Sequence, residues 1–301
     1  STAVNTACYL RLPSAKDKAE DVIRLFKPIL EDQNKVLISN DVKDDIIWLR
    51  RAGVEILNKI FDVKIAHYVL QPDSSHELER VALEMLNYRL IKGDNTENPQ
   101  LSLFPDEGAK KDKDFAERTD ILFRLKEKLE EALQEVGLYK LYEEIEMPLV
   151  SVLADMEYEG VSIDKVALDE LSEDLKIRIA ETEKIIYEMA GKEFNISSPK
   201  QLGEILFDQM NIDSGNKKTK TGQHSTSEQV LSKLEDAHPI VGHILNYRGL
   251  KKLLTTYAEA LPTYIDPATG KIHTHFNQAE AATGRLSSLN PNLQNIPIRT
   301  A

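Results

Sequence analysis

Side-chain amides, hydroxyls and guanidinium groups are concentrated near the C-terminal end of the chain, in residues 283–299. Gly284, Pro291 and Pro297 interrupt this segment, so we expect an extended, turning segment that presents its side chains outward. The minor groove of a DNA duplex offers a purine N3 or pyrimidine O2 acceptor at every base pair. Hydrogen-bond donors in such a segment therefore suit a protein that senses base-pair geometry without reading sequence. The alternative is a structural turn in which Asn and Gln side chains bond the backbone of their own loop.

Basic side chains gather in one part of a chain that is acidic as a whole. The net charge is −12, yet residues 216–256 contain seven Lys or Arg and three acidic residues. Because non-specific binding of nucleic acid depends on a local excess of cations, this partition is compatible with a DNA partner.

Two segments of this half place cations where phosphate groups bind well. Ser198 and Pro199 have the pattern of a helix N-cap and first helical residue, and Lys200 follows them. A helix N-terminus beside a lysine favours an anion. Residues 216–224 contain no apolar residue to bury, and their lysines are Lys217, Lys218 and Lys220. Plain helix capping and a solvated loop are the alternatives at these two places.

An amphipathic helix is predicted for residues 239–261. Its apolar residues fall within about 100° of one another on a helical wheel, and they are Ile240, Tyr247, Leu250, Leu254, Tyr257 and Leu261. Arg248, Lys252 and Thr255 fall on the opposite side. A helix with cations and a hydroxyl on its outer face is able to lie along a phosphate strand.

The first 90 residues alternate between strand and helix patterns, which indicates an α/β layer structure. The expected strands are residues 6–12 and 35–39, and the expected helices are residues 19–30, 44–52, 60–70 and 78–87.

A carboxylate cluster of Asp41, Asp44 and Asp45 follows the second expected strand. Carboxylates that converge at the end of a strand are able to hold the magnesium ions that cleave phosphodiesters. The alternative is that they cap the following helix and favour its positive end.

Long helices dominate the remainder of the chain. Residues 121–159 are expected to be helical with a break at Gly137, and residues 165–190 form a second helix. Asp164 is a suitable N-cap for the second helix, and Gly191 is a suitable residue to end it.

Several motifs resemble DNA polymerase family A, the DNA polymerase I group. Residues 273–278 and 283–299 resemble the segment that leads from the thumb to the palm of those enzymes. Residues 144–149, 156–161 and 247–250 are similar to the same family. The resemblance implies a 3′–5′ exonuclease-like domain with a ribonuclease H-like α/β fold in residues 1–130. A mostly α-helical thumb is expected in residues 131–275, and the start of the palm in residues 276–301.

The same resemblance implies an exonuclease site that has decayed. With Gly53 and Glu55 as reference, Lys43 and Asp45 fall on the second exonuclease motif, and Asp45 falls on its metal-binding aspartate. The first motif has no counterpart. In the third motif Arg118 stands where the catalytic aspartate is expected, and an arginine repels the metal ions. The expected remnants are Asp45, Lys43 and Asp120, with Asp45 as the remaining metal ligand.

The function implied by the resemblance is a non-sequence-specific grip on primer-template duplex DNA. The intact enzyme uses Mg²⁺ and deoxynucleoside triphosphates, but the chain ends before the family's palm carboxylates, so we expect a fragment with no bound cofactor and no polymerase site. The expected DNA-binding residues are Lys200, Lys217, Lys218, Lys220, Arg248, Lys252, Thr255, Arg285, Asn292, Gln294 and Asn295.

Two other functions stay open from the sequence. An active 3′–5′ exonuclease requires three or four carboxylates at one metal site, which Asp45, Asp62 and Asp120 would supply. A non-enzymatic module that docks on the sliding clamp is the other alternative. Its docking peptide would be Gln100, Leu101, Leu103 and Phe104, in a long polar loop.

Composition places the chain among ordinary globular proteins, with 41% hydrophobic and 29% charged residues. No apolar run approaches the roughly 18 residues of a membrane span. The single Cys8 fits a reducing compartment. We therefore expect a cytoplasmic protein associated with the nucleoid.

Overall fold

The computed structural model describes residues 2–7, 10, 12–13, 16–91, 107–212 and 224–297. The chain divides into two compact units. Unit 1 comprises Ser1–Gly160 and His273–Asn295, and unit 2 comprises Val161–Ile272 and Ile296–Ala301. The predicted domain boundary at residue 130 falls inside a helix of unit 1. The predicted boundary at residue 275 falls at the start of a strand of the same unit.

Unit 1 contains a parallel pair of strands, β1 (Val36–Ser39) and β2 (Lys59–Asp62). The helix α3 (Val42–Arg51) connects them, so the strand predicted for residues 35–39 and the helix predicted for residues 44–52 are confirmed, whereas β2 was not predicted as a strand. The helix predicted for residues 60–70 is wrong in its first residues. Asp62 ends β2 and caps α4 (Val63–Leu70) by accepting a hydrogen bond from the Ile65 N–H at 3.0 Å. The strand predicted for residues 6–12 is not found in the described part of that range.

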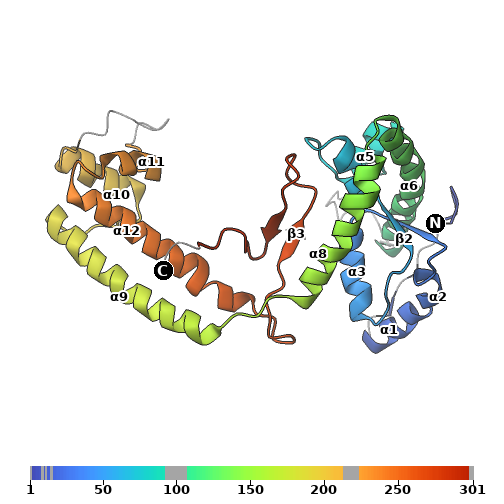
Figure 1. The fold of residues 1–301 in the computed structure, drawn as a ribbon, viewed down its shortest axis with the longest axis horizontal. Helices are drawn as coiled ribbons and strands as arrows, with labels where there is room; N and C mark the ends of the chain where they lie inside the picture. Colours follow the sequence, from blue (N-terminus) through green and yellow to red (C-terminus); the bar gives the residue numbers. More distant parts are fainter. Residues whose placement is uncertain are drawn as a thin grey trace. The chain divides into compact units, whose positions relative to one another are not determined.

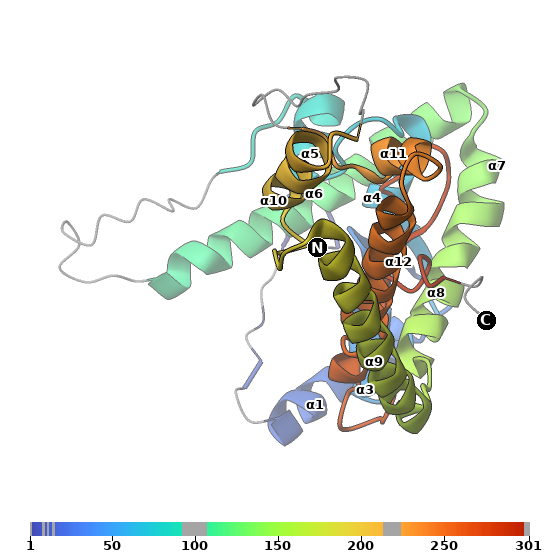
Figure 2. The ribbon, with the colours of Figure 1, turned by 90° about the vertical axis from the view of Figure 1, so that its left-hand side faces the viewer.

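Unit 1 contains seven further helical elements among the described residues. They are α1 (Lys16–Arg24), α2 (Lys27–Leu30), α5 (Leu78–Leu86), α6 (Glu107–Glu135), α7 (Tyr139–Leu141), the π-helix η1 (Tyr142–Glu146) and α8 (Met147–Glu159). Of these, α6 packs on β1 and α8 on β2. Leu125, Leu129 and Leu133 recur every four residues along α6 and are completely buried against α4 and α5. The predicted break at Gly137 is confirmed, and α7, η1 and α8 then follow one another as one helical run (Figure 2).

The C-terminal part of unit 1 is an antiparallel pair of short strands, β3 (His275–Asn277) and β4 (Ser287–Leu289). Phe276 lies opposite Ser288 in this pair. The extended, turning path predicted for residues 283–299 is confirmed as far as residue 297, and Gly284 adopts a φ of +74° in the turn before β4.

Unit 2 is helical and is built on two long helices, α9 (Lys165–Ala190) and α12 (Pro239–Leu253), which run side by side in opposite directions (Figure 1). The predicted limits of α9 are confirmed. Asp164 accepts a hydrogen bond from the Ala167 N–H at 3.1 Å, and Gly191 ends the helix with a φ of +70°.

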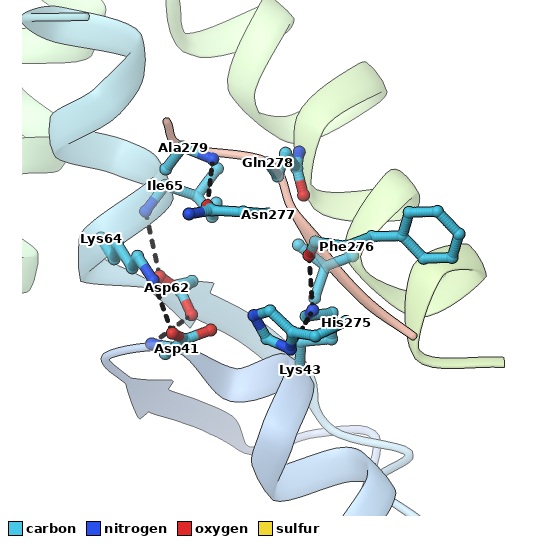
Figure 3. A pocket seen from close by; sticks show the side chains of 11 residues that line it. Asp41, Lys43, Asp62, Lys64, Ile65, His275, Phe276, Asn277, Gln278 and Ala279 are labelled. Atoms are coloured by element: carbon cyan, nitrogen blue, oxygen red, sulfur yellow. Dashed lines mark hydrogen bonds and ion pairs between the residues drawn. The ribbon is translucent and has the colours of Figure 1, made fainter. Parts of the chain in front are cut away.

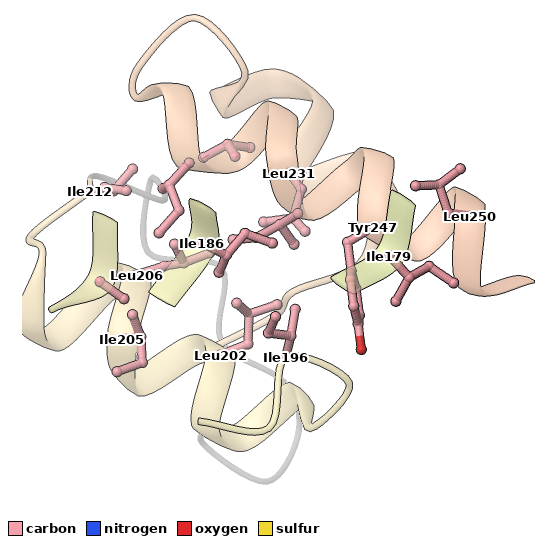
Figure 4. Close-up of a cluster of buried hydrophobic side chains, with 14 of the residues drawn as sticks. Ile179, Ile186, Ile196, Leu202, Ile205, Leu206, Ile212, Leu231, Tyr247 and Leu250 are labelled. Atoms are coloured by element: carbon pink, nitrogen blue, oxygen red, sulfur yellow. The ribbon is translucent and has the colours of Figure 1, made fainter. Parts of the chain in front are cut away.

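Shorter helices connect α9 with α12 or continue the chain after α12. They are α10 (Pro199–Gly203), the π-helix η2 (Glu204–Gln209), α11 (Glu228–Leu231), the 3₁₀-helix η3 (Ser232–Leu234), the π-helix η4 (Leu254–Ala258) and the 3₁₀-helix η5 (Leu261–Tyr264). Side chains from α9, α10, η2, α11, α12 and η4 converge on one apolar core, in which Ile186, Leu202 and Leu231 are completely buried (Figure 4). The core therefore fixes the place of α10 and α11 against α12.

Two neighbouring isoleucines of α9 give a matched test of this core. Ile186 is completely buried, whereas Ile185 is 36% exposed. We expect Ile186→Ala to lower the free energy of unfolding by about 2–5 kcal/mol, because the substitution leaves a cavity. Ile185→Ala should change it by less than about 1 kcal/mol. Urea denaturation of both variants measures the difference, and equal losses would contradict the packing of α9.

Candidate nucleic-acid interface

An open groove of about 510 Å³ lies in unit 2. Its walls are the start of α10, the segment 224–227 and one face of α12. Cations and hydroxyl groups dominate the lining, and these residues are Ser197, Ser225, Thr226, Ser227, Tyr247, Arg248, Lys251, Lys252 and Thr255. Such a lining suits an anionic, oxygen-rich ligand such as a phosphate chain.

The α12 helix faces the groove as its amphipathic pattern predicts. Tyr247 and Leu250 are buried in the core of unit 2, while Lys252 and Thr255 are exposed. The Thr255 hydroxyl donates to the backbone oxygen of Lys251 at 2.9 Å, so its proton is used within the helix. The Lys252 side chain has a free cationic group, because it makes no hydrogen bond or ion pair with any other described residue.

Arg248 holds the groove together in addition to lining it. Its guanidinium donates to the backbone oxygen of Thr226 at 2.5 Å and to the Thr226 hydroxyl at 3.3 Å. Burial lowers the pKa of Arg248, and the Glu228 carboxylate acts in the opposite direction. The arginine therefore fixes the segment that carries Ser225 and Ser227, with its own charge still part of the lining.

Lys251 also lines the groove, although it was not among the DNA-binding residues predicted from the sequence. Its side chain, like that of Lys252, has no partner among the described residues. Its position next to Lys252, about 100° around the helix, was the available signal. The two lysines give the groove two uncompensated positive charges.

The remaining residues predicted for phosphate contact fall in different places. Ser198 caps α10 as predicted, accepting from the Gln201 N–H at 3.5 Å, and Pro199 lines the groove. Lys200 is exposed on α10 but does not line the groove. Lys217, Lys218 and Lys220 lie outside the described residues.

The segment predicted to face the minor groove belongs to unit 1. Some of its polar side chains bond their own loop, and others are exposed. Asn292 Oδ1 accepts from the Gln294 N–H at 3.0 Å, and Gln294 Nε2 donates to the Leu286 oxygen at 3.0 Å. These amides bond their own loop, as in the structural-turn alternative. Arg285 is exposed and makes no hydrogen bond or ion pair with another described residue. Asn295 is also exposed.

The exonuclease-like residues do not converge on one metal site in the described part of the chain. Asp45, near the start of α3, accepts from the Ser39 hydroxyl at 2.6 Å. The surrounding protein removes its carboxylate from water and raises the pKa of Asp45, and Asp41 and Asp44 add to this effect. Asp120 instead accepts from the Asn5 N–H at 2.5 Å and pairs with Arg124 on α6.

Asp62 has a structural role. It is completely buried, and its carboxylate accepts from the backbone N–H groups of Asp41 at 2.9 Å, Val42 at 2.7 Å and Ile65 at 3.0 Å. Burial raises the pKa of Asp62 to about 6, although these three bonds favour its charged form. A carboxylate bonded in this way joins the starts of α3 and α4 and is not available to a metal ion.

One group of three candidate metal ligands does occur among the described residues, namely Asp44, Glu157 and His275, whose ligand atoms lie within 4.8 Å of one another. The Lys43 ammonium lies in the same place, 3.2 Å from His275 Nδ1 (Figure 3). It is paired with the Glu157 carboxylate. Because a lysine cation already neutralises Glu157, this group is an internal ion pair, and Lys43 is directed into the protein.

Comparison with known proteins agrees with this geometry. Residues 165–301 match the family model described as DNA polymerase family A, and residues 1–134 match the model described as 3′-5′ exonuclease. The chain belongs to DNA polymerase family A. The resemblance found in the sequence is therefore confirmed.

Two DNA polymerases I and one solved polymerase structure are similar to this chain. The chain is 40% identical to DNA polymerase I of Geobacillus stearothermophilus over 276 residues, which is 91% of this chain and 31% of that protein. It is 47% identical to the thermostable DNA polymerase I of Thermus thermophilus over 188 residues, which is 62% of this chain and 23% of that protein. The POL domain of Pol1 from M. smegmatis, solved in complex with DNA primer-template and dNTP, has a TM-score of 0.76. It is 29% identical to this chain and covers 95% of it, and 47% of that domain is matched.

The chain thus spans about a third of the length of the curated polymerases that it matches. Among the described residues, no helix is long and apolar enough to cross a membrane.

The scattered carboxylates of this family A chain lead to a prediction about nuclease activity. We expect no 3′–5′ degradation of a 5′-labelled primer above background in Mg²⁺ or Mn²⁺, because Asp45 and Asp120 have separate partners and Asp62 is buried. Gel analysis of primer length over time measures this, with Asp45→Ala as the control. Degradation that disappears in Asp45→Ala would contradict the prediction.

Proposed function

We propose that this chain grips the duplex of a primer-template without sequence specificity, as part of a DNA polymerase of the DNA polymerase I type. The observation that carries the proposal is the groove of unit 2, with its uncompensated Lys251 and Lys252. The relative solved with primer-template DNA supports the same partner class.

The chemistry of the groove favours backbone contact over base readout. Its donors are ammonium, guanidinium and hydroxyl groups, which suit phosphate oxygens along a strand, and lysine lacks the planar geometry for bidentate contact with a base. Phosphate contacts position a protein on DNA but carry no sequence information. A replication and repair polymerase must accept every sequence, so a grip of this kind fits its work.

We assign the phosphate contacts to Lys251 and Lys252, with Arg248 as a charged support of the groove wall. The other cations expected to take part are Lys200, Lys217, Lys218 and Lys220. Arg285 is the residue that we assign to the minor groove, since Asn292 and Gln294 serve their own loop.

The finer architecture belongs to the same proposal. We assign the ribonuclease H-like exonuclease fold to unit 1, the thumb to unit 2 and the start of the palm to residues 276–301. Mg²⁺ and deoxynucleoside triphosphates serve the intact polymerase. Asp45 is absent from the one group of candidate metal ligands found among the described residues, so these residues do not fit a two-metal site. The clamp-docking peptide, residues 100–104, lies outside the described residues, and no observation favours it.

Two exposed lysines of unit 2 provide a matched test of the grip. Lys252 lines the proposed DNA groove, whereas Lys184 on α9 lines a different surface groove. Lys252→Ala should weaken binding to duplexes of any sequence and reduce the slope of log affinity against log salt by about 0.9, the value of one phosphate contact. Lys184→Ala removes the same charge and should leave the slope unchanged.

Fluorescence anisotropy with two duplexes of unrelated sequence, over a range of salt concentrations, measures both variants. Equal effects of Lys252→Ala and Lys184→Ala would show that net charge alone matters and would overturn the assignment of the groove. A loss confined to one of the two sequences would overturn the non-specific character.

A further inference from the structure

The Lys43 ammonium is buried in unit 1, where it has three acceptors. Lys43 is 6% exposed, and its Nζ is paired with the Glu157 carboxylate. It also donates to the Phe276 oxygen at 2.6 Å and lies 3.2 Å from His275 Nδ1 (Figure 3). An ammonium group has three protons, so its hydrogen-bonding capacity is fully used within the protein.

Glu157 completes the contact from α8. Its carboxylate accepts from the Phe276 N–H at 2.6 Å, and its backbone oxygen lies 2.7 Å from the His273 ring nitrogen Nδ1. The N–H and C=O of Phe276 are therefore both bonded to the Lys43–Glu157 pair. The two side chains therefore satisfy main-chain hydrogen-bonding groups of β3 that a second neighbouring strand would otherwise satisfy.

Hydrogen bonds connect the residues around β3 and β4 with the loop that follows β4. The Thr274 hydroxyl lies 3.0 Å from the Leu289 oxygen and 2.7 Å from the Pro291 oxygen. The completely buried Ser288 hydroxyl accepts from the Leu293 N–H at 3.1 Å and from the Gln294 N–H at 3.3 Å. These contacts leave little freedom between β3 and residues 290–294.

The turn that carries Arg285 is held by the same body. The Tyr68 hydroxyl of α4 donates to the Ala281 oxygen at 2.8 Å, and Gln278 Nε2 donates to the Glu146 oxygen at 2.9 Å. The segment His273–Asn295 is thus attached to the rest of unit 1 at β3 and at the turn that follows β3.

We propose that Lys43 and Glu157 are positioning residues that hold the β3–β4 segment in place for DNA. The part of this inference that concerns DNA rests on the proposed function. The resemblance drawn from the sequence places Lys43 in the second exonuclease motif. In this proposal Lys43 instead holds the β3–β4 segment, which belongs to the polymerase part of the chain. The exonuclease-like body then has a function without nuclease activity, as the anchor of residues that contact the duplex.

A variant that lacks both charges of the buried pair separates the loss of contacts to β3 from a general loss of stability. Removing one partner leaves an uncompensated buried charge and is strongly destabilising, whereas replacing both partners with apolar groups is often neutral. Lys43→Met combined with Glu157→Met therefore restores charge balance. The double variant still leaves the N–H and C=O of Phe276 without their partners.

Hydrogen exchange of peptides, measured by mass spectrometry, tests the inference without DNA. In the Lys43→Met/Glu157→Met variant we expect peptides from residues 273–295 to exchange at least about tenfold faster, while β1, β2 and α4 keep their protection. Lys64→Met is the matched control, because Lys64 lines the same pocket and pairs with Asp41 at 2.6 Å. Protection of residues 273–295 that equals that of the unsubstituted chain would overturn the inference.

A cycle with Arg285→Ala tests the consequence for DNA. In the unsubstituted chain, Arg285→Ala should weaken duplex binding by roughly tenfold, as loss of a charged hydrogen bond does. In the Lys43→Met/Glu157→Met background the same substitution should have less than about a threefold effect, because the arginine is no longer held in place. Equal losses in both backgrounds would overturn the positioning role.

The two proposals fail in different ways. If Arg285→Ala has no effect in the unsubstituted chain, the minor-groove assignment of the proposed function is wrong, and hydrogen exchange alone decides whether the pair holds β3. If exchange in residues 273–295 stays slow, the pair does not hold β3, whatever the DNA result.

Discussion

The buried Lys43–Glu157 pair links three parts of unit 1 that are far apart in the sequence. Lys43 lies in the first turn of α3 in the exonuclease-like part, Glu157 lies near the end of α8, and both bond the main chain of Phe276 on β3. A two-stranded pair as short as β3 and β4 is not stable by itself. Its place in the protein therefore depends on side chains of the exonuclease-like body, which explains why His273–Asn295 belongs to unit 1.

Charge is distributed so that an acidic chain retains a basic surface. The chain has a net charge of −12, but Lys251 and Lys252 have no acidic partner among the described residues. Elsewhere many cations are paired within the protein, as Arg50 is with Asp155 and Lys64 with Asp41. The cations that remain unpaired on the groove are those available to phosphate groups, and acidic residues elsewhere limit binding to other faces.

Local patterns in the sequence predicted the local structure well. The capping residues Asp164 and Gly191 gave both ends of α9, and the apolar stripe of α12 gave its buried face. One prediction that failed concerned residues 60–62, where a short apolar run has no helical or strand period of its own. The strand predicted for residues 6–12 was also not found in the described part of that range. The roles of Lys43 and Arg248 were not predictable either, because their partners Glu157, Phe276 and Thr226 are brought near by tertiary packing. Sequence alone left two possibilities for Asn292 and Gln294, and their bonds within the loop distinguish them.

The salt dependence of duplex binding shows whether the chain holds DNA through its phosphate groups. Binding of the chain to a blunt DNA duplex, measured by fluorescence anisotropy between about 50 and 200 mM salt, follows the number of phosphates that the protein neutralises. With three to five phosphate contacts, we predict that log affinity falls against log salt with a slope of roughly −3 to −5, since each contact contributes about −0.9. An affinity that does not change with salt would show that the chain does not hold DNA through phosphate contacts.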